Sequence, residues 1–426
     1  MPLFFCGISR GGISGHKNAD MNSLGAEINS IDKKREWPEQ HPASHKVEAV
    51  PGKVVWLTSF VPPYAVSMYQ SVGEQLQDFL LLLSTEMEKG RTWTPDVSLP
   101  NTRIQRTLSW TYQSRHPNGS SQKLQSHFPY DTVPLLLKEK PQVVISSELG
   151  TRTLQALAYR LMRPSTRLIV KATLSEVTEQ GRGRLRNWLR RILLKRADAV
   201  MTNGQSGARY LGRFGVPSEK LFIVPSTTEM TELMRVPLQR PSGAAFRLLY
   251  VGRLIQSKGL LPFFEVLRAW ATAHVARVLH LSVVGSGELQ SSLQEFGFPA
   301  NVIVEFVGEV PFAKLPDLYV ESGILVLPTF SDEWGLVVNE GMAAGLPVLG
   351  STYGQAVEEL VEDGITGWTF RPDYPNEMYA ALDRALNTSE SCLNEMRNAV
   401  RARICDLTPQ HAAALVMDAV RFVSRP

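Results

Sequence analysis

The chain has 426 residues, of which 43% are hydrophobic and 20% are charged, and its formal net charge is +4. This length is too great for one ordinary domain and suits two of common size, and the composition is that of a soluble globular protein. The charge is modest and no nucleic-acid-binding module is recognisable, so we expect no nucleic acid among its partners.

The first 52 residues are rich in Ser, Gly, Asn, His, Lys and Glu and lack hydrophobic periodicity, which predicts a flexible extension. Their apolar start is too short for a secretory signal and lacks a leading basic region. No apolar stretch reaches the roughly eighteen residues of a membrane span. The cysteines Cys6, Cys392 and Cys405 show no metal-ligand spacing. Together these features predict a protein of the reducing cytoplasm.

Residues 53–225 alternate apolar strand patterns with helical patterns, which predicts an α/β domain with a parallel sheet. The first strand, 53–60, precedes a proline turn and a helix expected to run through about Met87. Further strands are predicted at 142–146, 168–172, 197–202 and 221–225. Residues 226–243 contain two prolines and no sustained pattern, so we expect an interdomain linker there.

A strongly basic helix is predicted within the first domain. Residues 182–196 contain seven basic and no acidic side chains, and apolar residues recur among them at helical spacing. Such a helix either lies on an anionic membrane surface or packs its apolar stripe on its own sheet. The candidate membrane contacts are Arg186, Trp188, Arg190 and Arg191.

Residues 246–260 have the pattern of an apolar strand, a loop beginning with Gly252 and Arg253, and a helix after Lys258. Two cations on a loop at the end of a strand suit a diphosphate. The planar guanidinium of Arg253 can donate two hydrogen bonds to one phosphate, and the ammonium of Lys258 offers a compact positive charge. Residues 279–289 repeat the strand-then-glycine pattern. We interpret that glycine turn as structural, because such turns are common in these sheets.

Residues 325–350 have the pattern of a strand, an acidic loop, a short helix, a turn and a second strand. The helix begins after Gly335, so free backbone NH groups and the positive end of its dipole predict a phosphate site. Asp332 and Glu340 have seven residues between them, so both carboxylates can face one crevice and bind hydroxyls. A phosphate site beside such acids suits a nucleotide sugar. An ordinary buried unit with a helix-capping acid would have the same pattern.

Residues 246–372 resemble the family 4 glycosyltransferases, which are retaining enzymes of the glycosyltransferase-B (GT-B) fold. The motifs VGRLIQSKG, VVGSGEL, FVGEV, LVLPTFSDEWGLVVNEGMAAGLPVLGS and DGITGWTF occur in the order that the family has. The resemblance implies an α/β fold of two Rossmann-like domains facing a central cleft. Residues 53–225 would form the acceptor-side domain, 244–408 the nucleotide-sugar-binding domain, and 409–426 a helix that returns to the first domain.

The resemblance also implies roles for individual residues. Arg253 and Lys258 match the diphosphate-binding pair of the family, and Glu340 matches the acid that binds the ribose hydroxyls. Asp332 occupies the position of the first Glu, which contacts the donor sugar, and the neighbouring Glu333 is the alternative after a small loop shift. The other implied donor contacts are Gly252, Gly335, Leu336, Val337 and, for the base, Val307.

The implied activity is transfer of a sugar from a UDP- or GDP-sugar to a glycan or lipid-linked acceptor, in surface or extracellular polysaccharide synthesis. No metal or other cofactor is expected, because the cations neutralise the diphosphate and no Asp-x-Asp cluster is present. The alternatives are a nucleotide-sugar epimerase or phosphorylase of the same architecture and a non-catalytic sugar-nucleotide binder. The first domain lacks the family's paired-glycine loop at 61–70 and its usual His near 171–174, which leaves the acceptor contacts unassigned.

Overall fold

The computed structural model describes residues 52–88, 99, 101–115, 121–181 and 183–425. The chain divides into two compact units, Met1–Glu48 and Ala49–Pro426, and the described residues all belong to the second. Apart from Gly52, the extension expected over residues 1–52 lies outside the described residues.

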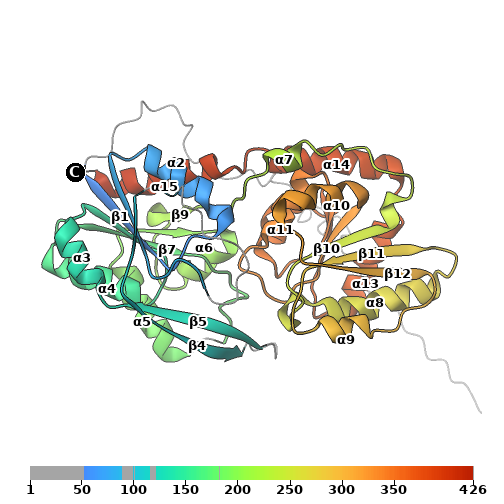
Figure 1. Ribbon diagram of the computed structural model, residues 1–426, viewed down its shortest axis with the longest axis horizontal. Coiled ribbons are helices and arrows are strands. Elements are labelled where there is room, and N and C mark those ends of the chain that lie inside the picture. The colour runs from blue at the N-terminus through green and yellow to red at the C-terminus, as the bar shows by residue number, and fades with distance from the viewer. Residues whose placement is uncertain (1–51, 89–98, 100, 116–120, 182, 426) are drawn as a thin grey trace, which may run out of the picture. The chain divides into compact units, whose positions relative to one another are not determined.

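The first domain is built on a parallel sheet of seven strands, in the order β3-β2-β1-β6-β7-β8-β9 (Figure 1). The strands are β1 (Lys53–Thr58), β2 (Asp78–Leu83), β3 (Thr102–Ile104), β6 (Val143–Ser146), β7 (Arg167–Ala172), β8 (Ala199–Thr202) and β9 (Leu221–Ile223). Most of these strands are continuous apolar runs, because helices cover both faces of the sheet. The helices are α2 (Val66–Glu74), α3 (Thr132–Glu139), α4 (Thr151–Met162), α5 (Arg184–Lys195) and α6 (Gln205–Gly212).

The prediction of one helix through about Met87 was wrong. Helix α2 ends at Glu74, and the apolar run that follows is strand β2, which pairs in parallel with β1. All five residues of that run, 79–83, are buried. The periodicity of a short apolar run does not distinguish a buried strand from a buried helix. Here the run forms a strand because β1 is available to pair with it.

A hairpin that the sequence analysis did not anticipate follows β3. Strands β4 (Thr107–Arg115) and β5 (Ser121–Pro129) pair only with each other, in antiparallel register from Thr107 opposite Pro129 to Arg115 opposite Ser121. Its signal was present in the sequence, because apolar residues alternate with polar ones over 108–113.

The second domain has a parallel sheet of six strands, in the order β12-β11-β10-β13-β14-β15. The strands are β10 (Arg247–Val251), β11 (Leu279–Val284), β12 (Val302–Gly308), β13 (Ile324–Leu327), β14 (Val348–Ser351) and β15 (Gly367–Phe370). Around them lie α8 (Leu260–Ala273), α9 (Gln290–Gln294), α10 (Leu315–Glu321), α11 (Leu336–Ala343), α12 (Gln355–Leu360), α13 (Pro375–Leu386) and α14 (Glu390–Ile404). Both sheets therefore have the doubly wound strand order of Rossmann-like domains.

The segment between the two sheets runs along the second domain. It contains one short helix, α7 (Thr231–Met234). Arg240 donates to the carbonyl oxygens of Ser322, at 3.0 Å, and Ala344, at 2.6 Å. Arg401 donates to the carbonyl oxygen of Val236 at 2.6 Å. These bonds hold a segment without sequence periodicity in a defined path.

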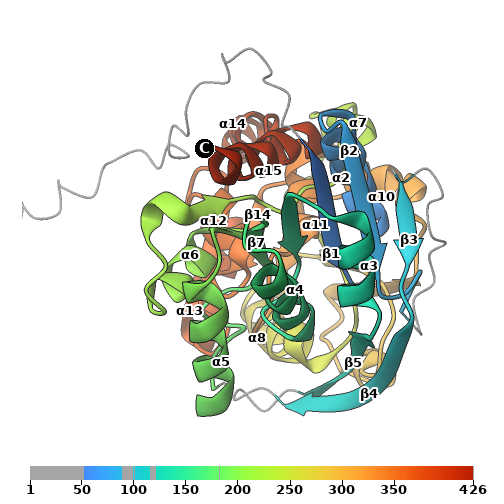
Figure 2. The ribbon, with the colours of Figure 1, turned by 90° about the vertical axis from the view of Figure 1, so that its left-hand side faces the viewer.

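The last helix, α15 (Pro409–Ser424), packs on the first domain. Thr408 caps it by accepting a hydrogen bond from the amide of His411 at 3.1 Å. Its apolar face, which includes Val416 and Val420, is buried against α2 and the first sheet (Figures 1 and 2). The chain thus crosses between the domains a second time. None of the helices in the described part of the chain is both long enough and apolar enough to span a membrane.

Candidate functional site

A cavity lies where the second sheet reverses its strand order. Strands β10 and β13 are neighbours, but the chain leaves them in opposite directions, so the loops at their carboxyl ends separate and form a crevice. The cavity there has a volume of about 480 Å³. The predicted site residues that line it are Gly252, Arg253, Lys258, Asp332, Glu333, Gly335, Leu336 and Val337.

The loop after β10 places Arg253 in the cavity wall. The hydroxyl of Tyr250 donates to the carbonyl oxygen of Arg253 at 2.8 Å, and the amide of Gly252 donates to the carbonyl oxygen of Val284 at 2.9 Å. A Cβ atom on Gly285 would lie 2.1 Å from the carbonyl oxygen of Gly252. This close approach supports the structural interpretation of the second glycine turn.

The ammonium of Lys258 pairs with the carboxylate of Asp332. The two residues meet because the loop after β10 packs on the end of β13, where Phe330 donates its amide to the carbonyl oxygen of Ser257 at 2.8 Å. Gly259 has φ +71°, and a Cβ atom there would lie 2.0 Å from the carbonyl oxygen of Pro328. Only glycine fits this contact without a shift of the backbone.

The start of helix α11 forms the opposite wall of the cavity. Gly335 precedes the helix with φ +99°, and no side chain caps it. Leu336 and Val337 are its first two residues and both line the cavity. The first amides of a helix have no partner within the helix and carry the positive end of its dipole, so this wall suits an anion.

Glu340 lies in the second turn of α11 and is not among the residues that line the cavity. Its carboxylate accepts a hydrogen bond from the hydroxyl of Tyr319 at 3.1 Å. Burial raises the pKa of Glu340 to about 7, against the smaller opposing effect of that hydrogen bond. Val307, in β12, is likewise absent from the lining. The structure thus gathers eight of the ten predicted donor residues in one cavity and leaves these two outside it.

The first domain contributes to the same cavity. Tyr64 and Thr173 line it, together with Ser226 at the start of the connecting segment. Thr173 falls in the segment where the family usually has a His, which was the one sequence signal for this wall. Tyr64 ends the proline turn after β1 and carried no signal of its own.

The two domains also meet through hydrogen bonds to the acidic loop. The backbone carbonyl oxygen of Glu333 accepts bonds from the amide side chains of Asn203 and Gln355. Gln355 also accepts a bond from the amide of Gly207 at 3.0 Å and donates to the carbonyl oxygen of Leu174 at 3.3 Å. Residues from both domains therefore hold the backbone of Glu333.

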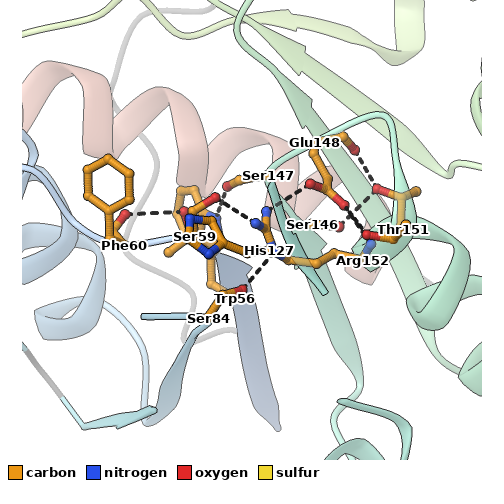
Figure 3. A network of polar contacts seen from close by, with 12 residues as sticks. Trp56, Ser59, Phe60, Ser84, His127, Ser146, Ser147, Glu148, Thr151 and Arg152 are labelled. Carbon is orange, nitrogen blue, oxygen red and sulfur yellow. Dashed lines mark hydrogen bonds and ion pairs between the residues drawn. The ribbon is translucent and has the colours of Figure 1, made fainter. Parts of the chain in front are cut away.

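A buried polar network joins strand ends in the first domain (Figure 3). The guanidinium of Arg152, which is 2% exposed, donates to the hydroxyl of Ser59 at 2.6 Å and to that of Ser84 at 3.0 Å, and pairs with the carboxylate of Glu148 at 3.0 Å. A buried charge is tolerated when it is paired and hydrogen-bonded in this way. The network ties together the carboxyl ends of β1, β2 and β6.

Lys171 is a second cation near those strand ends. Its ammonium lies 5.4 Å from the centre of the Trp56 ring, a cation–π contact. Burial lowers the pKa of Lys171 to about 8.

The basic helix predicted over 182–196 is α5, and it has a buried side and an exposed side. Leu193 and Leu194 are buried in the core, whereas Trp188 is 60% exposed. Arg186 and Arg191 are also exposed.

The expectation that Arg190 contacts a membrane was wrong. Its side chain is buried, where it pairs with the carboxylate of Glu179 at 2.5 Å and donates to the hydroxyl of Tyr210. Helical spacing predicts Arg190 on the polar side of the helix. The segment before α5 contains Glu179, however, and its buried carboxylate pairs with Arg190 inside the domain.

Two doubly wound domains, with a cavity at the switch point of the second, form the architecture of the GT-B glycosyltransferases. Two family models match successive parts of the chain. The model described as "Glycosyl transferase 4-like domain" matches residues 40–227, and the one described as "Glycosyl transferases group 1" matches residues 245–388. The chain belongs to the glycosyltransferases of GT-B type.

Similar proteins support the same assignment. The D-inositol 3-phosphate glycosyltransferase of Nocardiopsis dassonvillei is 27% identical over 247 residues, which are 52% of this chain and 53% of that protein. The chain spans about half the length, or less, of the first curated relatives it matches.

Two solved structures share the fold. HepE of Anabaena, in complex with UDP, has a TM-score of 0.62 at 13% identity, and the match covers 87% of this chain and 99% of that one. The lipopolysaccharide outer core galactosyltransferase WaaB has a TM-score of 0.64 at 14% identity, with coverage of 87% and 99%.

Proposed function

We propose that this protein is a retaining hexosyltransferase that uses a nucleotide-diphosphate sugar as donor and a glycan or lipid-linked acceptor, in surface or extracellular polysaccharide synthesis. One observation carries the proposal. A guanidinium, an ammonium and an uncapped helix start line a single cavity at the switch point of the second domain. The structural neighbour HepE has been solved in complex with UDP and with UDP-glucose, which favours a UDP-sugar among the possible donors.

The proposed chemistry follows from the charge that develops during transfer. When the bond between the anomeric carbon and the phosphate oxygen breaks, its electron pair stays on the diphosphate and positive charge develops on the sugar ring. Arg253, Lys258 and the amides at the start of α11 stabilise the departing diphosphate. Removing one preorganised donor of this kind commonly costs about two to three powers of ten in turnover.

Retention would follow from attack on the face from which the diphosphate leaves. The acceptor hydroxyl forms the new bond to the anomeric carbon, and its proton passes to a phosphate oxygen of the leaving group. Tyr64 and Thr173 of the first domain line the cavity, and we expect this hydroxyl to approach from their side. They supply a polar surface for an acceptor in place of the paired-glycine loop and the His of other family members.

The two neighbouring acids differ in their surroundings. Asp332 is held by Lys258, whereas Glu333 is exposed and is fixed through its backbone. We propose that Asp332 contacts the donor sugar, because its pairing with Lys258 places it beside the diphosphate. Glu340 would bind the ribose hydroxyls, and Val307 would lie near the base.

The transfer reaction is tested by incubating the purified protein with a panel of radiolabelled UDP- and GDP-sugars and candidate acceptors. Transfer with retained anomeric configuration supports the proposal. Interconversion of the donor would instead indicate an epimerase, and binding without turnover would indicate a non-catalytic binder. Activity that survives EDTA would support the proposed independence from metal.

The location of the protein is part of the proposal. A cytoplasmic enzyme with a lipid-linked acceptor would act at the inner face of the membrane, and the exposed Arg186, Trp188 and Arg191 of α5 suit contact with anionic lipid. Flotation of the wild-type protein with anionic vesicles tests this contact.

A further inference from the structure

The first domain has an exposed apolar surface that donor binding does not use. Seventeen large apolar side chains are exposed among the described residues, and eight of them lie on three elements of this domain. They are Leu108, Trp110 and Tyr112 of β4, Leu154, Leu161 and Met162 of α4, and Leu185 and Trp188 of α5. We call these eight residues the hairpin surface.

The three elements are neighbours in space. Helix α4 contacts both β5 and α5. Figures 1 and 2, which differ by a quarter turn, both place the hairpin and α5 at the lower end of the first domain. The exposed residues thus come from three adjoining elements of the domain.

The hairpin is itself amphipathic. Leu108, Trp110 and Tyr112 alternate along β4, so they share one face, and they are 60%, 51% and 43% exposed. On the other face, the hydroxyl of Ser109 bonds to Nδ1 of His127 at 2.8 Å. Exposed apolar faces of this kind mark interaction surfaces.

The charged side chains that belong to the elements of the hairpin surface are all basic. Strands β4 and β5 and helices α4 and α5 contain nine Arg and Lys residues and neither Asp nor Glu. Arg152, Arg160 and Arg190 pair with acids from outside these elements. Helix α5 exposes other cations, Arg184, Arg186, Arg191 and Lys195. The exposed cations of α5 therefore suit an anionic partner, and the apolar side chains suit one that also offers an apolar medium.

We propose that the hairpin surface docks on an anionic lipid bilayer. Five of its eight residues are Leu or Met, which gain from insertion into hydrocarbon, whereas a nucleic acid or an acidic glycan offers them no such medium. Trp110, Tyr112 and Trp188 suit the level of the headgroups, and the arginines of α5 suit the anionic lipid itself.

Docking thus involves the hairpin and α4 as well as α5. The inference rests on the proposed function only in that a lipid-linked acceptor gives the enzyme a reason to bind a membrane.

The test measures flotation of the full chain with vesicles of phosphatidylglycerol and phosphatidylcholine, and with phosphatidylcholine alone, in the absence of donor. Hairpin (Leu108→Ser with Trp110→Ser), α4 (Leu161→Ser) and α5 (Leu185→Ser with Trp188→Ser) variants are compared with wild type. The matched control is Val275→Ser with Phe312→Ser, two exposed apolar residues of the second domain.

We expect the hairpin and α5 variants to lower the floated fraction at least about fivefold, the α4 variant to lower it less, and the control to float like wild type. Thermal unfolding of each variant should stay unchanged, because all the substituted residues are exposed. Phosphatidylcholine alone should bind the wild-type protein weakly.

Two results would overturn the inference. One is a hairpin variant that floats like wild type. The other is light scattering that shows a wild-type dimer which the hairpin variant separates, since a second copy would then cover the surface. Transfer to a water-soluble acceptor analogue is measured in parallel. Flotation without transfer would count against the proposed function and leave lipid docking standing. Transfer without flotation would count against lipid docking and leave the proposed function standing.

Discussion

The ammonium of Lys258 donates a hydrogen bond to the carboxylate of Asp332, so a proposed phosphate-binding cation is joined to a proposed sugar-binding acid. Their side chains are only 16% and 18% exposed, which weakens screening by water and strengthens the pair. In the proposed function, a bound diphosphate would compete with Asp332 for the same ammonium. Donor binding would therefore loosen this pair and free the carboxylate for the hydroxyls of the sugar.

Replacing Lys258 by Ala should lower kcat by about two to three powers of ten, because the leaving diphosphate loses one of its fixed donors. Initial rates at saturating donor measure this effect. Lys314→Ala is the matched control, since Lys314 is an exposed lysine of the same domain that does not line the cavity. A turnover near that of wild type in Lys258→Ala would refute the leaving-group role.

Asp332→Asn and Glu333→Gln should separate the two candidate sugar-binding acids. We expect Asp332→Asn to reduce kcat/KM for the donor at least about tenfold. The substitution removes the negative charge that pairs with Lys258 and that would accept hydrogen bonds from the hydroxyls of the donor sugar. Glu333→Gln should change it by less than about threefold, because the part of Glu333 held by Asn203 and Gln355 is its backbone. The reverse order of effects would assign the role to Glu333.

Nucleotide affinity should rise with pH through about 7. Burial raises the pKa of Glu340 to about 7, so near neutral pH a good part of the free protein carries the neutral acid. The ionised carboxylate accepts hydrogen bonds from ribose hydroxyls, so binding favours that form. Calorimetric titration of UDP from pH 6 to 8.5 measures the trend. The Glu340→Gln variant lacks the titrating carboxylate, so its pH dependence reports the protonation of UDP itself. An equal pH dependence in both proteins would show that Glu340 does not bind the ribose.

Lys171→Met should stabilise the fold near pH 7. Burial lowers the pKa of Lys171 from its ordinary value of 10.5 to about 8, so below about pH 8 the folded protein holds a charge in an unfavourable place. The expected gain in unfolding free energy is roughly 1 to 3 kcal/mol. Between about pH 8 and 10.5 the unfolded chain binds more protons than the folded one, so wild-type stability rises there and the gain shrinks.

Urea denaturation at pH 7 and at pH 10 measures both values. The midpoint of Lys171→Met should exceed that of wild type more at pH 7 than at pH 10. A variant that is less stable than wild type at pH 7 would show that the contact of Lys171 with Trp56 outweighs the cost of burial.

Much of the candidate site was predictable from the chain alone. Arg253, Lys258 and the residues around Gly335 stand directly after apolar strands, and strand ends of a parallel sheet meet at one edge. Their chemistry and spacing therefore indicated one anion site, and the structure brings them into one cavity. Glu340 was placed correctly in the early helix, but its distance from the cavity lining depends on how α11 packs against Tyr319.

Local sequence patterns indicated many of the strands in the two sheets and the positions of the proposed phosphate-binding loops, because periodicity and glycine placement act over a few residues. Contacts between distant segments decided the rest. The run at 79–83 became a strand because β1 offered it a partner, and Arg190 turned inward because Glu179 lay within reach. The contribution of Tyr64 and Thr173 to the cavity likewise depends on folding that joins residues far apart in the chain, a relationship that no short pattern encodes.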